Sequence, residues 1–321
     1  MNPVSATDTG FFLIYKASNT SSLYKNDINS QHNTLLPMTE AYTTKFALNF
    51  TPTGMIPTKD INAHTPIQPD EIIQEVLEAR SFGISMVHLH ARDTDGKPTW
   101  KKETYKAIID GIRSVDGYGP DSLILCVSTS GRDWPDFERR SECLDLVGDS
   151  KPDMASLTLG SMNFAKSASI NSPEMIQSLL AKMNEKGIKP ELEIFDTGML
   201  NYAHYLKGKG MLKGPQYFNI ITGNIATAQT KALEIGTMIS QLPKDAIWAS
   251  GGLGASQLKA NVFGLINGGG VRIGLEDNIY MNAPKKTLAT NQALLTRIKD
   301  IASLLDITPY TPKELRKLLN L

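Results

Sequence analysis

Eight short apolar segments alternate with amphipathic segments between Phe46 and the C-terminus of this 321-residue chain. Each apolar segment has five to seven residues, the length of a buried strand, and the stretch after it has apolar residues at helical spacing. Strict alternation of strand and helix predicts a parallel sheet, and eight such units predict that the sheet closes on itself. The expected fold class is therefore α/β, a single (β/α)8 TIM barrel with an N-terminal extension.

The expected strands are the apolar segments themselves. They span 46–50, 86–91, 123–129, 154–159, 191–195, 217–222, 246–250 and 271–275. In a barrel of this kind the ligand site forms at the carboxyl ends of the strands, where the loops lead into the helices. Polar residues at those ends are therefore the candidates for function.

The expected helices follow from apolar stripes with start and stop signals. In the first helix, over 70–81, Pro69 favours the start, Gly83 favours the end, and the stripe consists of Ile72, Ile73, Val76 and Leu77. The other helices are expected over 103–115, 136–147, 173–186, 200–208, 229–242 and 256–266, and two terminal helices begin at Lys286 and Thr311.

Residues 1–44 are rich in Ser, Asn and Thr and have little apolar periodicity, so they are expected to form an N-terminal extension outside the core. The TIM-barrel catalytic domain then spans 45–321. A barrel of this class commonly takes about 250 residues as one domain, so the remaining length requires no second core.

Charge and cysteine content exclude several classes of protein. The chain has 33 basic and 33 acidic residues without a long block of either sign, so neither nucleic acid nor a membrane is an expected partner. Its two cysteines, Cys126 and Cys143, cannot build a disulfide framework and indicate a reducing compartment. No apolar run reaches the roughly 18 residues of a transmembrane helix, and no export signal is recognised. The expected location is the cytoplasm.

The second expected strand contains two histidines, His88 and His90. Side chains alternate along a strand, so these imidazoles project from one face together with Arg92 and can share a metal ion. The alternative is a pair of histidines held by hydrogen bonds alone. It is less favoured because two polar side chains aimed into a core cost several kcal/mol unless something binds them.

A third metal ligand is expected from the eighth strand. The remaining histidines, which fall outside all eight strands, are His32, His64 and His204. Alternation places Arg272, Gly274 and Glu276 on one face, with Glu276 near the rim. Two neutral imidazoles and one carboxylate are the usual catalytic zinc set, with one open position. A surface role for Glu276 is the weaker alternative.

Asp277 follows Glu276 and cannot share its face while the strand stays regular. If Asp277 turns into the mouth of the barrel, it is suited to general base catalysis and can be oriented by Arg272. The alternative, equally weighted, is a structural ion pair. In the fifth strand Glu191 and Glu193 share a face, and a buried carboxylate there would need Arg272 or Arg92 as a partner.

Two loops can bind anions. The third strand ends in Ser128-Thr129-Ser130-Gly131-Arg132, whose hydroxyl and backbone N–H groups suit a carboxylate or an oxyanion. Gly251-Gly252-Leu253-Gly254 follows the seventh strand and is a weak candidate for phosphate binding.

Five motifs together resemble the β-keto acid cleavage enzymes: HLHARDTDGKPTW, VSTSGR, KPDMASLTLGSMNF, KPELEIFDTGML and GGGVRIGLEDNIY. The resemblance covers Phe46 to the C-terminus in the same order. It implies a zinc-bearing barrel, one Zn²⁺ per chain, commonly a homotetramer. It also implies an acyltransferase for which acetyl-CoA is the cosubstrate: a β-keto acid and acetyl-CoA give acetoacetate and a new acyl-CoA.

The same resemblance implies roles for particular residues. His88, His90 and Glu276 match the family's zinc ligands. Arg272 and Asp277 match its catalytic arginine and aspartate pair, and Glu193, a third catalytic candidate, matches a motif glutamate of the fifth strand whose role stays open. The chemistry independently makes Asp277 the candidate base that removes a C2 proton. The positions that match its keto acid contacts are Ser128, Gly131 and Ser156, where Ser156 stands at a position that a threonine can occupy.

The loop after the first strand departs from the aminohexanoate enzyme of the family. That enzyme has a glutamate where an amino group would bind, and Ile56 fills the position here. An isoleucine cannot pair with an ammonium group, so we expect a β-keto acid without a cationic tail. The tail is then neutral or apolar, or anionic if Lys59 reaches the site.

Three other classes compete with this interpretation. The main alternative is a zinc hydrolase of the amidohydrolase type, which also uses two histidines one residue apart but needs further histidines on later strands. A class II aldolase usually has a metal set richer in histidine. A nonenzymatic metabolite-binding protein would need no open metal position.

Overall fold

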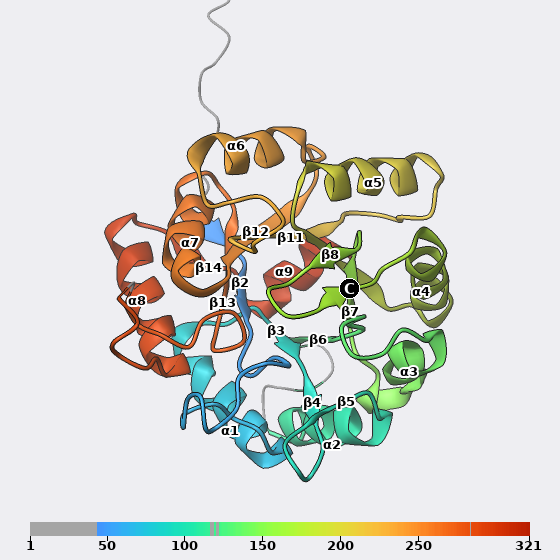
Figure 1. Ribbon diagram of the computed structural model, residues 1–321, viewed down its shortest axis with the longest axis horizontal. Helices are drawn as coiled ribbons and strands as arrows, with labels where there is room; N and C mark the ends of the chain where they lie inside the picture. The colour runs from blue at the N-terminus through green and yellow to red at the C-terminus, as the bar shows by residue number, and fades with distance from the viewer. Residues whose placement is uncertain (1–43, 116–118, 120–121, 283) are drawn as a thin grey trace, which may run out of the picture. The chain divides into compact units, whose positions relative to one another are not determined.

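A closed parallel barrel forms the centre of the molecule in the computed structural model, which describes residues 44–115, 119, 122–282 and 284–321. Its strands are β2 (Leu48–Phe50), β3 (Met86–Leu89), β6 (Ile124–Val127), β7 (Met154–Thr158), β10 (Lys189–Ile194), β11 (Tyr217–Thr222), β12 (Ile247–Gly252) and β13 (Gly270–Ile273). Neighbours in the barrel are also successive in the chain, and β13 closes it on β2 (Figure 1). The predicted fold class is confirmed, and all eight predicted strands are barrel strands.

In the part of the chain that the structure describes, eight α-helices surround the barrel (Figure 1). They are α1 (Pro69–Ala79), α2 (Lys102–Arg113), α3 (Phe137–Ser141), α4 (Pro173–Lys186), α5 (Thr197–Gly208), α6 (Ala232–Gln241), α7 (Gln257–Ile266) and α8 (Asn291–Leu304). The helix expected from Lys286 begins at Asn291 because Thr290 caps it, accepting the N–H of Ala293 at 3.0 Å. The helix expected over 136–147 is shorter, since a 3₁₀ turn, Glu142–Asp145, follows α3. None of the described helices has the length and apolar composition needed to cross a bilayer.

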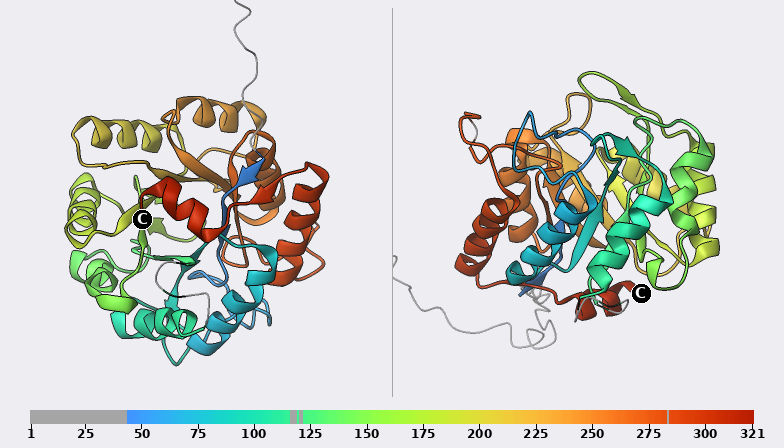
Figure 2. Two further views of the ribbon diagram at one scale, coloured as in Figure 1. Left: turned by 180° about the vertical axis from the view of Figure 1, so that it is seen from behind. Right: turned by 90° about the horizontal axis from the view of Figure 1, so that it is seen from below.

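The amino end of the barrel is closed by the last helix, α9 (Pro312–Leu319), which lies across it (Figure 2, left). Leu315 and Leu319 belong to one buried cluster with Met86 and Met154, which come from the starts of barrel strands. A short parallel pair of β1 (Lys45–Phe46) and β14 (Thr308–Pro309) leads into this helix. Among the described residues, the carboxyl end carries the loops that follow the barrel strands.

Two antiparallel hairpins, which the sequence did not predict, follow barrel strands at the carboxyl end. They are β4 (Ala91–Arg92) with β5 (Pro98–Thr99), and β8 (Met162–Asn163) with β9 (Ala168–Ser169). The expected strand 86–91 therefore ends at Leu89, and Arg92 belongs to a hairpin. Its guanidinium donates to the carbonyls of Gly54 and Pro57 at 2.7 Å each. Arg92 thus braces the loop after β2 and does not share a site with the histidines.

The predicted boundary between the extension and the catalytic domain remains a prediction, because residues 1–43 lie outside the described residues.

Candidate active site

A cavity of about 240 Å³ opens at the carboxyl end of the barrel. Its polar lining residues are His88, His90, Ser128, Ser130, Arg132, Thr158, Ser169, Glu193, Arg272, Glu276 and Asp277. Its apolar lining residues are Met55, Ile56, Met162, Phe164, Phe195, Ile221 and Leu253. The cavity lies where barrel geometry predicts a ligand site.

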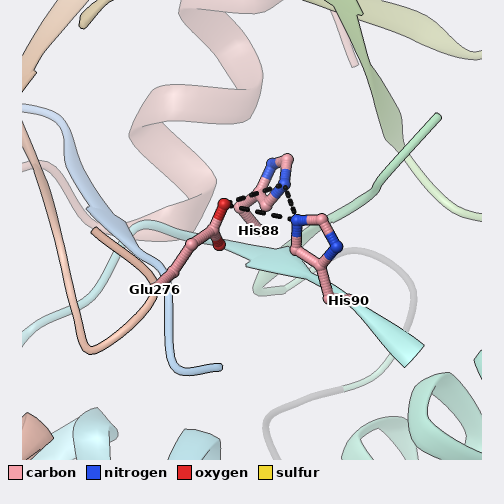
Figure 3. Close-up of side chains that lie close together, drawn as sticks. All are labelled: His88, His90 and Glu276. Atoms are coloured by element: carbon pink, nitrogen blue, oxygen red, sulfur yellow. Dashed lines mark hydrogen bonds and ion pairs between the residues drawn. The ribbon is translucent and has the colours of Figure 1, made fainter. Parts of the chain in front are cut away.

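His88 and His90 come from β3 and the residue after it, and Glu276 from the turn after β13. Their side chains meet in this cavity (Figure 3). The Nε2 atoms of the two histidines are 3.2 Å apart, and Glu276 Oε1 lies 3.3 Å from His90 Nε2 and 3.9 Å from His88 Nε2. One ligand atom from each residue falls within 4.8 Å of the others. The structure therefore brings together the three residues that the sequence predicted as metal ligands.

The other ring nitrogen of His88 is held by Glu191, deeper in the barrel. Nδ1 of His88 lies 2.6 Å from Glu191 Oε2, while Glu191 Oε1 accepts hydrogen bonds from the Asn49 and Asn219 amides at 2.7 Å each. Burial raises the pKa of Glu191, but His88, together with Arg272 and Cys126, lowers it to about 2. Burial lowers the pKa of His88, but Glu191 and Glu276 together raise it to about 9. The carboxylate is ionised, and it leaves Nε2 of His88 facing the cavity.

Arg272 in β13 joins three carboxylates at the cavity wall. Its Nε donates to Asp277 Oδ2 at 3.0 Å, and its Nη2 donates to Glu276 Oε1 at 2.6 Å. Its Nη1 donates to Glu193 Oε1 at 3.4 Å, and the second Glu193 oxygen accepts the Thr158 hydroxyl at 2.7 Å. Of the two arginines considered as partners for the fifth-strand carboxylates, Arg272 contacts Glu193.

Asp277 turns into the cavity and is ion-paired at the same time. Burial raises its pKa and the Glu276 charge adds to this, while Arg272 lowers it, and the pKa is raised to about 6. The two alternatives for Asp277, a residue of the mouth or a partner of Arg272, are therefore compatible.

A turn after β13 explains how adjacent residues face the same cavity. The strand ends at Ile273, and Gly274 packs so closely on the carbonyl of Thr51 that a Cβ has no room. The N–H of Glu276 donates to the Thr51 carbonyl at 3.2 Å, and the N–H of Asp277 donates to the Gly274 carbonyl at 3.3 Å. Strand alternation does not apply in this turn, so both side chains reach the site.

Of the three predicted keto acid contacts, one lines the cavity and two lie behind its wall. Ser128 lines the cavity. Ser156 is buried behind it, where its Oγ accepts the N–H of Thr129 at 3.1 Å. Gly131 also lies outside the lining, and a Cβ there would be 2.9 Å from Arg140 Cζ. The latter two residues shape the loop that presents Ser128.

The glycine-rich segment after the seventh strand contacts the turn that carries Asp277. Gly251 and Gly252 belong to β12, and the N–H of Gly254 donates to the Asp277 carbonyl at 2.7 Å. Leu253 between them lines the cavity.

Several cavity residues were missed from the sequence. Met162 and Phe164 come from the β8 hairpin and the residue that follows it, which no periodicity indicated. Arg132 was noted only as part of the third-strand loop, although it lines the cavity. Of the other histidines, His204 does not line the cavity, and its Nε2 lies 2.7 Å from the Gln241 carbonyl oxygen. His32 lies outside the described residues.

The fold and this site match one protein family. The family model for beta-keto acid cleavage enzymes matches residues 45–321, and the chain belongs to that family.

Individual relatives agree with this assignment. The 3-keto-5-aminohexanoate cleavage enzyme of Acetoanaerobium sticklandii is 32% identical over 267 residues, which cover 82% of this chain and 94% of that protein. The 3-oxoadipate:acetyl-CoA acetyltransferase of Cupriavidus necator is 34% identical over 251 residues, covering 77% and 84%. A solved ternary complex of ObcA with a C4-CoA adduct and oxalate shares the fold, with a TM-score of 0.68 at 18% identity over 80% of this chain and 68% of that chain.

Proposed function

We propose that this protein is a zinc-dependent β-keto acid cleavage enzyme that converts a β-keto acid and acetyl-CoA into acetoacetate and a new acyl-CoA. Family membership and the acetyl-CoA-dependent transferases among its relatives support this activity. The observation that carries the proposal is the convergence of His88 Nε2, His90 Nε2 and Glu276 Oε1 on one point of the cavity.

The residues present fit a zinc ion. Two imidazoles and one carboxylate are a catalytic zinc set, and Glu276 Oε2 is a buried oxygen with no hydrogen-bond partner among the described residues. The contact of Glu191 with His88 Nδ1 is the carboxylate–histidine arrangement that orients metal ligands. When bound, the ion would supply a Lewis acid that stabilises negative charge on the ketone oxygen of the substrate.

Asp277 is the proposed base, oriented by the Nε of Arg272. It takes a proton from C2 of the keto acid, and C2 attacks the thioester carbon of acetyl-CoA, releasing the coenzyme A thiolate. The thiolate attacks the original ketone carbon, and the bond from this carbon to C2 breaks. C2 keeps the electron pair and regains a proton from Asp277, which gives acetoacetate and acyl-CoA.

The remaining cavity residues position the substrate. Ser128 is proposed to hold the acid carboxylate, and Gly131 and Ser156 maintain the loop around it. Glu193 lies between Thr158 and Arg272, where it keeps Arg272 directed at Asp277.

The tail of the substrate differs among relatives, so family membership alone leaves it open. Ile56 lines the cavity, so this position offers an apolar side chain and no carboxylate to the substrate tail. Lys59 pairs with Glu71 and lies outside the cavity lining. A cationic tail is therefore disfavoured, and an anionic tail would need a partner other than Lys59.

The proposal is tested by incubating the purified protein with acetyl-CoA and single β-keto acids and measuring acetoacetate. We expect turnover of at least one acid with an uncharged or anionic tail, and loss of at least about 100-fold in His88→Ala. The exposed His204→Ala is the matched control, expected at wild-type rate. Wild-type activity in His88→Ala, or a purified protein without metal that is unaffected by chelator, contradicts the proposal.

A homotetramer in the cytoplasm is part of the same proposal. The tetramer is what the resemblance of the motifs implies, and two buried free cysteines, Cys126 and Cys143, suit a reducing compartment. Light scattering coupled to size-exclusion chromatography measures the oligomeric state. A monomer at micromolar concentration contradicts the proposed homotetramer.

A further inference from the structure

Arg132 is a cavity arginine with no ion-pair partner among the described residues. It lines the cavity, and its Nε is buried with no hydrogen-bond partner among the described residues. No ion pair of Arg132 occurs in the described part of the chain, whereas Arg272 in the same cavity has three carboxylates. Burying part of a guanidinium charge costs free energy unless an anion pairs with it. Arg132 is therefore available to pair with a negatively charged group of a ligand.

An aromatic ring lies against this guanidinium. Its Cζ lies 3.7 Å from the ring centroid of Phe164. The N–H of Phe164 donates to the Ser167 carbonyl at 2.8 Å, and the ring packs edge-on against Phe195 with centroids 6.4 Å apart. This ring covers one side of the guanidinium and leaves its Nη groups, which bond no described residue, for a ligand. Those groups match the two oxygens of a carboxylate.

Arg132 belongs to the outer part of the site. It lies five residues beyond Val127, the end of β6, and Phe164 lies six residues beyond Thr158, the end of β7. Phe164 follows β8, whose hairpin with β9 stands out from the carboxyl end of the barrel (Figure 2, right). His88, in contrast, is within a barrel strand. A substrate whose reacting carbons lie at His88 therefore directs its far end toward the rim and Arg132.

We propose that Arg132 is a specificity residue that binds a second carboxylate at the far end of the substrate, so that the preferred substrate is a β-keto dicarboxylate. This inference rests on the proposed function. The acid carboxylate next to C2 must stay beside the reacting carbons, where Ser128 is available. The phosphates of coenzyme A lie beyond the long pantetheine arm and fall outside a cavity of about 240 Å³.

The test compares two six-carbon substrates, 3-oxoadipate and 3-oxohexanoate, which differ in the distal carboxylate. The wild type is expected to favour 3-oxoadipate in kcat/KM. Arg132→Met should lose roughly 10- to 100-fold with 3-oxoadipate and less than about 2-fold with 3-oxohexanoate. Arg132→Lys should recover only part of the loss, since an ammonium group cannot stack and bind two oxygens together. Arg139→Met, at an exposed arginine of α3, is the control and should match the wild type.

Calorimetric titration of 3-oxoadipate without acetyl-CoA separates this inference from the proposed function. Weaker binding by Arg132→Met, with no change for 3-oxohexanoate, supports the role of Arg132 even if neither acid is turned over. Equal losses for both acids would assign Arg132 to the acid carboxylate and overturn the proposal. A rise in KM for acetyl-CoA alone would assign it to coenzyme A, with the same consequence.

Discussion

Glu191 Oε2 lies 2.6 Å from Nδ1 of His88, inside the barrel and on the side of the imidazole away from the cavity. Glu191 is fully buried, and its position is itself held by the Asn49 and Asn219 amides. This chain of contacts holds the imidazole ring of His88 so that its Nε2 points at His90 and Glu276. Glu191, which is not among the lining residues of the cavity, thus orients a residue that is.

The first prediction concerns this contact. Glu191→Gln keeps the shape but removes the negative charge, so zinc affinity should fall roughly 10- to 100-fold. Competition with a fluorescent zinc chelator measures the affinity. Glu185→Gln, at an exposed glutamate of α4, is the matched control and should bind zinc like the wild type. Equal zinc affinity in Glu191→Gln and the wild type would exclude an orienting role.

The second prediction concerns metal and stability. A ligand that binds only the folded state stabilises it by mass action, so zinc at about 100 times its dissociation constant should add about 2.7 kcal/mol to the free energy of unfolding. Chelator should remove this increment, which thermal unfolding measures. His90→Ala should lose most of the zinc-dependent rise in Tm, while the exposed His204→Ala should keep it. A zinc-dependent rise of the same size in His90→Ala would contradict the assigned ligands.

The third prediction concerns the base. Asp277→Asn removes the proton acceptor but keeps a polar side chain beside Arg272, so kcat should fall about 10²- to 10⁴-fold. The KM for the keto acid should change little, because the same variant retains the cavity walls. Asp245→Asn, at an exposed aspartate paired with Lys207, is the control. A fall in kcat below about 10-fold in Asp277→Asn would reject its role as base.

The fourth prediction concerns the turn that directs Glu276 and Asp277. Gly274→Ala introduces a Cβ where the Thr51 carbonyl leaves no space, so we expect a loss of about 1–3 kcal/mol in the free energy of unfolding. Urea denaturation measures the loss, and weaker zinc binding should accompany it. Gly208→Ala in α5 is the control, because its Cβ would meet nothing within 4 Å and alanine favours a helix. Wild-type stability in Gly274→Ala would contradict the close approach.

Local periodicity was enough to predict the barrel. The alternation around His88 and His90 and the apolar stripe of the first helix depend only on neighbouring residues, so they can be read along the chain. Strand order then predicted that the second and eighth strands bring Glu276 to the histidines. The turn at Gly274 was not predicted, because it results from contact with Thr51, a residue of a different loop.

Arg92 and Arg132 illustrate what stays hidden in a sequence. Alternation placed Arg92 beside the histidines, but a hairpin begins there and directs it to the carbonyls of Gly54 and Pro57. Arg132 gave no distinctive signal, since its importance depends on Phe164, which a separate hairpin supplies. The β4–β5 hairpin decided the position of Arg92, and contact with the β8–β9 hairpin gave Arg132 its aromatic neighbour.

The amino-acid sequence by itself determined the eight strands, the helices between them and the pair of histidines that marks the second strand, since these follow from short-range side-chain periodicity. Only the tertiary structure decided that Glu191 holds His88, that Asp277 faces the cavity and that Arg132 packs on Phe164. Each of these depends on atoms that barrel closure and loop packing bring within about 4 Å, and no local pattern in the chain encodes that distance.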